Sequence, residues 1–247
     1  MADKPVASTR STPIDARGEV DAFLQTVKKT PPSAVTQGRG RLVFSLDATA
    51  SRQATWNRAM SLQSKMFVNT RGIGELDVQL VYYRGFDECR ASKWLRNADQ
   101  VIGMMKKVNC QAGSTQIHRL LKHAIAEAKQ TPVQALVFIG DCVEEDVDRL
   151  GNLAGQCGLL NMPVFIFQEG NNSLASMAFK QIATLSGGAH CRFDESSAKA
   201  LGDLLNAVAA YAAGGRQALQ QLQKQGSGQA KALLEQMGGQ DFDRAHK

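Results

Sequence analysis

Three short segments of this sequence carry side-chain oxygens that suit the binding of a divalent cation. Asp47, Thr49 and Ser51 alternate along the first segment, so a turn that follows a strand can point their oxygens the same way. Thr115 and Asp141 stand in the other two segments. Mg²⁺ requires an octahedral shell of oxygens, which in proteins combines one or two carboxylates with neutral oxygens and waters. Two carboxylates and three hydroxyls fit such a shell.

The surrounding pattern predicts a fold that can bring these segments together. Short apolar, β-rich runs alternate with helical patterns, which is typical of an α/β protein with a doubly wound, mainly parallel sheet and helices on both faces. We expect about six strands, at residues 41–46, 78–83, 89–92, 135–139, 164–167 and 190–193. We expect helices at residues 51–67, 97–108, 115–128, 145–157, 174–185 and 197–213. Ser114 and Ser196 are predicted to cap the helices that follow them.

The order of these elements places the candidate ligands at one edge of the sheet. In open α/β sheets, ligands bind in the crevice beyond the carboxyl ends of the strands. Asp47 directly follows the first predicted strand, and Asp141 follows the strand at 135–139. Thr115 opens a predicted helix between them. We therefore expect all three segments to converge there.

Residues 40 to 213 resemble the von Willebrand factor A family. The family's Asp-x-Ser-x-Ser motif is similar to Asp47-x-Thr49-x-Ser51, where the threonine keeps the hydroxyl and adds a methyl group. The family's isolated threonine, in a glycine-rich loop that opens a helix, matches Thr115. Its aspartate after the next central strand matches Asp141. Together these motifs form a metal-ion-dependent adhesion site in that family.

The resemblance implies a protein-interaction module of the cytoplasmic bacterial type. It implies that the hydroxyls of Thr49, Ser51 and Thr115 bind Mg²⁺ or Mn²⁺ directly, while Asp47 and Asp141 act mainly through water. A carboxylate from a partner protein would then complete the coordination shell. Cytosolic bacterial relatives often serve as adaptors for larger machines, including AAA+ ATPases, so the resemblance implies a partner of that kind.

Three alternatives stay open at this point. The Asp, Thr and Ser side chains could simply cap helices, which is their commonest local role. The cation site could be idle in a purely structural domain. Alternatively, Asp47 could be the nucleophile of a phosphatase of the haloacid dehalogenase type, with the Gly140-Asp141 segment holding Mg²⁺. Such a phosphatase site would lack its general acid, because Thr49 stands where these phosphatases need a second aspartate. We therefore expect no enzymatic activity.

Composition and length fit one domain with flanking segments. The 247 residues are 43% hydrophobic and 21% charged, as in ordinary globular proteins with a packed core. We expect an extended or partly disordered segment at 1–38, the von Willebrand factor A-like domain at 39–213, and an amphipathic helical tail at 214–247. No apolar run is long enough to predict a membrane span or a signal peptide, so we expect a cytoplasmic location.

The basic character of the chain does not predict specific nucleic-acid binding. Residues 42–213 hold 17 Lys and Arg against 16 Asp and Glu, which leaves +5 of the net charge of +6 in the flanking segments. Neither a cluster of basic residues nor interleaved aromatic residues accompanies this charge. The five cysteines form no CxxC pair, so their spacing predicts neither a disulfide framework nor a zinc motif. The acidic cluster at 144–148 predicts a solvated first turn of a helix, or the rim of the cation site.

Overall fold

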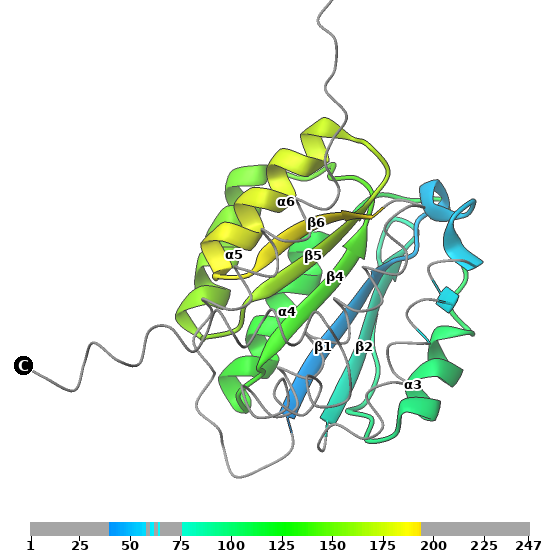
Figure 1. The fold of residues 1–247 in the computed structure, drawn as a ribbon, viewed down its shortest axis with the longest axis horizontal. Helices are drawn as coiled ribbons and strands as arrows, with labels where there is room; N and C mark the ends of the chain where they lie inside the picture. Colours follow the sequence, from blue (N-terminus) through cyan, green and yellow to red (C-terminus); the bar gives the residue numbers. More distant parts are fainter. Residues whose placement is uncertain (1–39, 58–59, 62–63, 65–75, 194–247) are drawn as a thin grey trace, which may run out of the picture.

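A six-stranded sheet forms the centre of the domain (Figure 1). The computed structural model describes residues 40–57, 60, 61, 64 and 76–193. The strands are β1 Gly40–Asp47, β2 Leu76–Arg84, β3 Glu88–Ala91, β4 Ala135–Gly140, β5 Val164–Glu169 and β6 Ala189–Phe193. Their order across the sheet is β3-β2-β1-β4-β5-β6. All neighbouring pairs are parallel except β2 and β3, which form an antiparallel hairpin at the edge.

Helices cover both faces of this sheet. They are α3 Ala98–Met105, α4 Ile117–Gln130, α5 Val147–Leu159 and α6 Ser173–Ser186, with a short 3-10 turn η1 at Ala50–Arg52. α4, α5 and α6 pack on one face, in a core cluster that includes Leu120, Leu150 and Phe179. The other face packs against α3 and against Trp56 and Met60. The central strands β1, β4 and β5 are buried along almost their whole length, as expected for parallel strands covered on both sides.

The predicted fold class and all six predicted strands are confirmed, with boundaries that differ by one or two residues. The weakest candidate, at 89–92, is the short edge strand β3. The helix predicted to start at residue 51 instead opens with η1, and its first α-helical residue is Trp56. Two helix starts also differ, since α4 begins at Ile117 and α5 at Val147.

Several predictions concern residues outside the described part of the chain. These are the N-terminal segment 1–38, the helix at 197–213 with its cap Ser196, the tail 214–247 and much of residues 58–67. The division into domain and flanking segments therefore stays a prediction. Among the helices that the structure describes, none combines the length and the apolar character needed to cross a bilayer.

Candidate metal centre

Asp47 is completely buried at the carboxyl end of β1. Its Oδ1 accepts a hydrogen bond of 2.8 Å from the backbone N–H of Thr49, which turns the chain as it leaves the strand. Its Oδ2 accepts a hydrogen bond of 2.9 Å from the hydroxyl of Tyr83, which is the residue paired with Asp47 on the neighbouring strand β2. The carboxylate is thus fixed from both sides.

The hydroxyls of Thr49 and Ser51 lie together just past this turn. Their oxygens are 3.0 Å apart, with Thr49 buried and Ser51 exposed. Thr49 occupies the N-cap position of η1, yet its side chain makes no capping hydrogen bond. The capping alternative therefore does not explain the hydroxyl of Thr49.

Asp141 follows β4 and lies beside Asp47. One ligand atom from each of Asp47, Asp141 and Cys142 can be chosen so that all three lie within 4.8 Å of one another. Oδ1 of Asp141 is buried and has no hydrogen-bond partner. A buried carboxylate oxygen without a partner is costly unless something of opposite charge pairs with it. This oxygen and the neighbouring ligand atoms of Asp47 and Cys142 therefore fit a bound cation.

Thr115 is held against the loop that carries Asp141. Its hydroxyl accepts a hydrogen bond of 3.0 Å from the backbone N–H of Glu144, and its own N–H donates one of 2.9 Å to Oε2 of Glu144. The same α3–α4 loop also contacts the first segment, since the N–H of Gln111 donates to the carbonyl of Ala48 over 2.9 Å. The α3–α4 loop therefore touches both aspartate-bearing segments.

The start of α4 is capped from outside its own sequence. The prediction that Ser114 caps this helix is wrong, because the Ser114 N–H donates to the Gly85 carbonyl and α4 begins at Ile117. The carboxylate of Glu145 instead accepts hydrogen bonds from the N–H groups of Ile117, at 2.7 Å, and His118, at 2.9 Å. It also lies 2.6 Å from Nδ1 of His118.

The acidic cluster at 144–148 divides into two pairs. Glu144 and Glu145 reach back to Thr115 and α4, so they are not part of a solvated first turn. Asp146 and Asp148 follow the prediction, since both are exposed at the start of α5. Asp146 is the N-cap and accepts from the N–H of Arg149 at 2.8 Å. The two glutamates thus join the Asp141 loop to α4.

Arg52 connects the strands that carry the site, and its role was not predicted from the sequence. Its buried guanidinium pairs with Glu169 at the end of β5, with N–O distances of 2.9 and 3.1 Å. The same guanidinium donates to the backbone carbonyls of Asp47 and Ile139, at the ends of β1 and β4. Thr55 adds a hydrogen bond of 2.6 Å to Glu169. The side chain of Arg52 therefore links the ends of three strands, β1, β4 and β5, next to the candidate cation site.

The electrostatics of the site favour the binding of a cation. Burial raises the pKa of Asp47 above its usual value, and the nearby Asp141 raises it further, although hydrogen bonds from Thr49 and the charge of Arg52 oppose this. Burial, with the carboxylates of Asp141 and Asp47, raises the pKa of the Cys142 thiol to about 12. Both shifts mark a place where additional negative charge is unfavourable. A divalent cation would reverse them.

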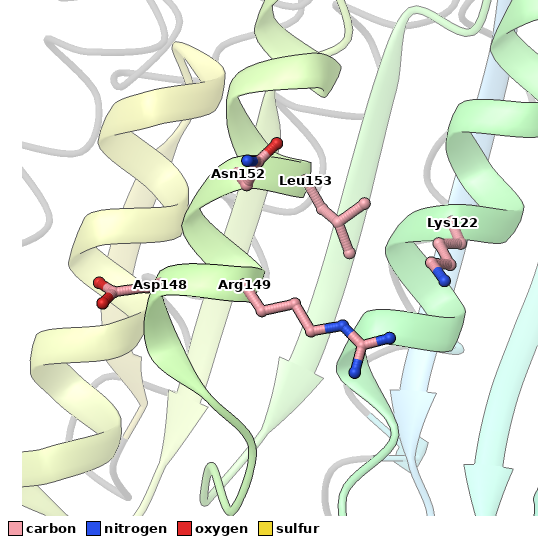
Figure 2. Close-up of a pocket in the computed structure, with 5 residues that line it drawn as sticks. All are labelled: Lys122, Asp148, Arg149, Asn152 and Leu153. Carbon is pink, nitrogen blue, oxygen red and sulfur yellow. The ribbon is translucent and has the colours of Figure 1, made fainter.

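A separate groove lies between α4 and α5 (Figure 2). It is lined by Lys122, Asp148, Arg149, Asn152 and Leu153 and has a volume of about 350 Å³. The side chain of Arg149 extends toward α4, while Asp148 points toward the opposite side of α5. None of the five predicted ligands lines this groove.

Comparison with solved structures supports the fold. No family model and no curated protein matches this sequence. Among solved structures, an aerotolerance-related membrane protein from Bacteroides fragilis NCTC 9343 is 18% identical, with a TM-score of 0.54 over 68% of this chain and 98% of that chain. A von Willebrand factor type A protein from Catenulispora acidiphila is 14% identical, with a TM-score of 0.59 over 72% of this chain and 43% of that chain. The SpRpn10 VWA domain is 11% identical, with a TM-score of 0.52 over 68% of this chain and 95% of that chain.

This chain has the von Willebrand factor A fold. The identities are low, so the likeness extends to the architecture and not to ligands or partners. Within that fold Asp47 is the last residue of β1, Asp141 follows β4, and Thr115 lies just before α4. Tyr83, Arg52 and Cys142 are the residues of the site that the motif does not include.

Proposed function

We propose that this von Willebrand factor A-fold chain is a protein-interaction module without enzymatic activity, which binds its partner through a divalent cation. Asp47, Thr49, Ser51, Thr115 and Asp141 would hold Mg²⁺ or Mn²⁺, with the three hydroxyls as direct ligands and the two aspartates acting mainly through water. A carboxylate of the partner protein would occupy the remaining position of the shell. The cation's contribution is positive charge, and the protein residues position it.

The observation that carries this proposal is the buried, unpartnered Oδ1 of Asp141 beside the buried carboxylate of Asp47. Two carboxylates this close repel one another in a poorly hydrated site, and burial, with the charge of Asp141 added to it, raises the pKa of Asp47. Protonation or a bound cation relieves that repulsion. The neighbouring hydroxyls of Thr49 and Ser51 supply neutral oxygens suited to a hard cation.

The residues give the phosphatase alternative no support. A nucleophilic aspartate must present a free oxygen to the phosphorus atom. Asp47 is completely buried, and both of its oxygens accept hydrogen bonds, from Thr49 and from Tyr83. Thr49 also cannot act as a general acid at neutral pH.

The partner class and the cellular location are part of the proposal. The solved structures with this fold include the SpRpn10 VWA domain and a pilus adhesin, SpaC, from Lactobacillus rhamnosus GG. Together with the resemblance of the metal-site motif, they support a role in binding proteins. We propose a cytoplasmic chain whose partner is an AAA+ ATPase or another multi-subunit machine.

Calorimetric titration of the purified chain with Mg²⁺ and with Mn²⁺ tests the cation site. We expect saturable binding by the native chain, and at least a tenfold loss of affinity in Asp47→Asn and in Asp141→Asn, which keep the side-chain size but remove the charge. Asp148→Asn is the matched control, since this exposed aspartate lies seven residues beyond Asp141, and its affinity should equal that of the native chain. Equal affinity in all four proteins, or no binding at all, would overturn the proposed site.

A pull-down from native lysate then tests the interaction. Partner capture should require the cation, fail with a chelator, and be lost in Asp47→Asn but kept in Asp148→Asn. Capture that persists with the chelator and in Asp47→Asn would show that partner binding does not use this site.

A further inference from the structure

A thiol stands beside the two aspartates of the candidate site. The Sγ of Cys142 lies within 4.8 Å of a carboxylate oxygen of Asp47 and of a carboxylate oxygen of Asp141. These two oxygens also lie within 4.8 Å of each other. Cys142 directly follows Asp141 in the loop after β4, so any cation held by Asp141 meets this thiol as well. The three ligand atoms come from the end of β1 and from the loop that follows its neighbour β4.

The spacing suits one small metal ion that binds sulfur. Zn²⁺ binds cysteine sulfur at about 2.3 Å and carboxylate oxygen at about 2.0–2.2 Å in a tetrahedral arrangement, so two ligands of one ion lie roughly 3.5 Å apart. The ligand atoms of the present cluster lie within 4.8 Å of one another, so rotation of the side chains would have to bring them closer by up to about 1.3 Å. The buried, unpartnered Oδ1 of Asp141 is a second, independent sign that the cluster accommodates a cation.

Ligand softness decides which cation such a cluster prefers. Carboxylates, hydroxyls and water suit Mg²⁺, whereas a soft thiolate favours Zn²⁺ and does not favour Mg²⁺. Of the five cysteines, Cys142 is the one that joins a cluster of potential ligands in the described part of the chain. The remaining ligands of the site are all oxygens, so Cys142 determines whether it is a purely oxygen site.

We infer that Cys142 is a direct ligand of the cation held at Asp47 and Asp141, and that it makes the site select Zn²⁺ over Mg²⁺. This inference rests on the proposed function, because it concerns the same site. On binding, the cation displaces the thiol proton to solvent, and no oxidation or reduction takes place. The interaction module would therefore respond to zinc, with Mg²⁺ binding weakly at the same place.

Cobalt titration tests this inference, because Co²⁺ substitutes for Zn²⁺ and shows a near-ultraviolet sulfur-to-cobalt charge-transfer band only when a thiolate binds it. The reduced native chain should show the band, and Zn²⁺ should abolish it at concentrations at which Mg²⁺ has no effect. Cys142→Ser should lack the band, and its ratio of Zn²⁺ to Mg²⁺ affinity should fall by roughly tenfold or more. Cys89→Ser, on the edge strand β3, is the matched control and should behave like the native chain.

The possible outcomes separate the inference from the proposed function. If Co²⁺ binds in an Asp47-dependent way without the band, or if Cys142→Ser keeps both the band and the zinc preference, then Cys142 is not a ligand and the oxygen site stands. If none of Mg²⁺, Mn²⁺, Co²⁺ and Zn²⁺ binds the native chain, the proposed function and this inference both fail.

Discussion

Arg52 places a positive charge in the interior of the protein, where the carboxylate of Glu169 forms an ion pair with it. Its side chain is fully buried and that of Glu169 nearly so. Buried ion pairs of this kind add little stability over an apolar pair, because both charges lose their water. Removing one residue of the pair lowers the stability of the protein much more, since the other charge is left buried without a counter-charge. The structural role of Arg52 is therefore to hold the ends of β1, β4 and β5 in place.

Arg52→Met should lower the free energy of unfolding by roughly 3–5 kcal/mol, because the carboxylate of Glu169 is left without its partner. The double variant Arg52→Met/Glu169→Leu removes both charges and should recover at least half of that loss. Urea unfolding at pH 7 measures both effects. A loss below about 1 kcal/mol in the single variant, or a double variant less stable than the single one, would contradict this assignment.

The candidate ligands were predictable at the scale of single residues, but the residues that support them were not. Asp47, Thr49 and Ser51 form a local pattern that can be read from three neighbouring positions. Arg52 and Cys142 each follow a motif residue directly, yet their roles depend on Glu169 and on the pairing of β1 with β4. Such contacts join positions far apart in the chain, so a single sequence does not reveal them.

At the scale of elements, the α3–α4 loop has to pass very close to the turn between β2 and β3. A side chain at Gly113 would overlap the backbone of Gly85, so the close passage requires glycine at this position. The next two residues fix the loop, since the Ser114 N–H donates to the Gly85 carbonyl and Thr115 contacts Glu144. Gly113 therefore controls where the Thr115 hydroxyl lies.

Gly113→Ala should cost about 1–3 kcal/mol of stability, because the backbone must shift to make room for the new methyl group. It should also weaken Mg²⁺ binding, since the shift moves Thr115. Gly103→Ala is the control: this position in α3 has open space around it, and alanine there should be neutral or stabilising by up to about 1 kcal/mol. Thermal unfolding and cation titration of both variants give the comparison. Equal stability of the two variants would show that the loop does not need this close contact.

The sheet was predictable element by element, whereas the helix starts were less so. Runs such as 135–139 and 164–167 are short and apolar, and each is bounded by a glutamine on one side and by glycine or proline on the other, so they identify buried strands directly. The start of α4 is different, because its cap comes from Glu145 across the loop after β4. The local candidate Ser114 was therefore the wrong choice of cap.

For the whole molecule, a polar network lies between β5, β6 and α6, on strands that carry none of the candidate ligands. Nε2 of His190 lies 2.9 Å from Oε1 of Gln168, which also accepts a hydrogen bond from Ser176. Ser176 in turn accepts from Arg192 at 3.0 Å. Burial, with the charges of Lys180 and Arg192, lowers the pKa of His190 to about 4. The imidazole is therefore neutral in the folded protein at neutral pH.

This partly buried histidine makes the domain sensitive to acid. The unfolded chain binds a proton at His190 near pH 6.5, while the folded chain does so only near pH 4. Between these values the unfolded state holds more protons, so stability is full above pH 6.5 and is lost as the pH falls toward 4. We expect the native chain to lose roughly 2 kcal/mol more than His190→Gln between pH 7 and pH 4.5. The glutamine keeps a donor for Gln168 and cannot titrate, so urea unfolding of both proteins at the two pH values isolates the contribution of His190. Parallel losses in the two proteins would mean that His190 is protonated in the folded state and that other groups set the acid sensitivity.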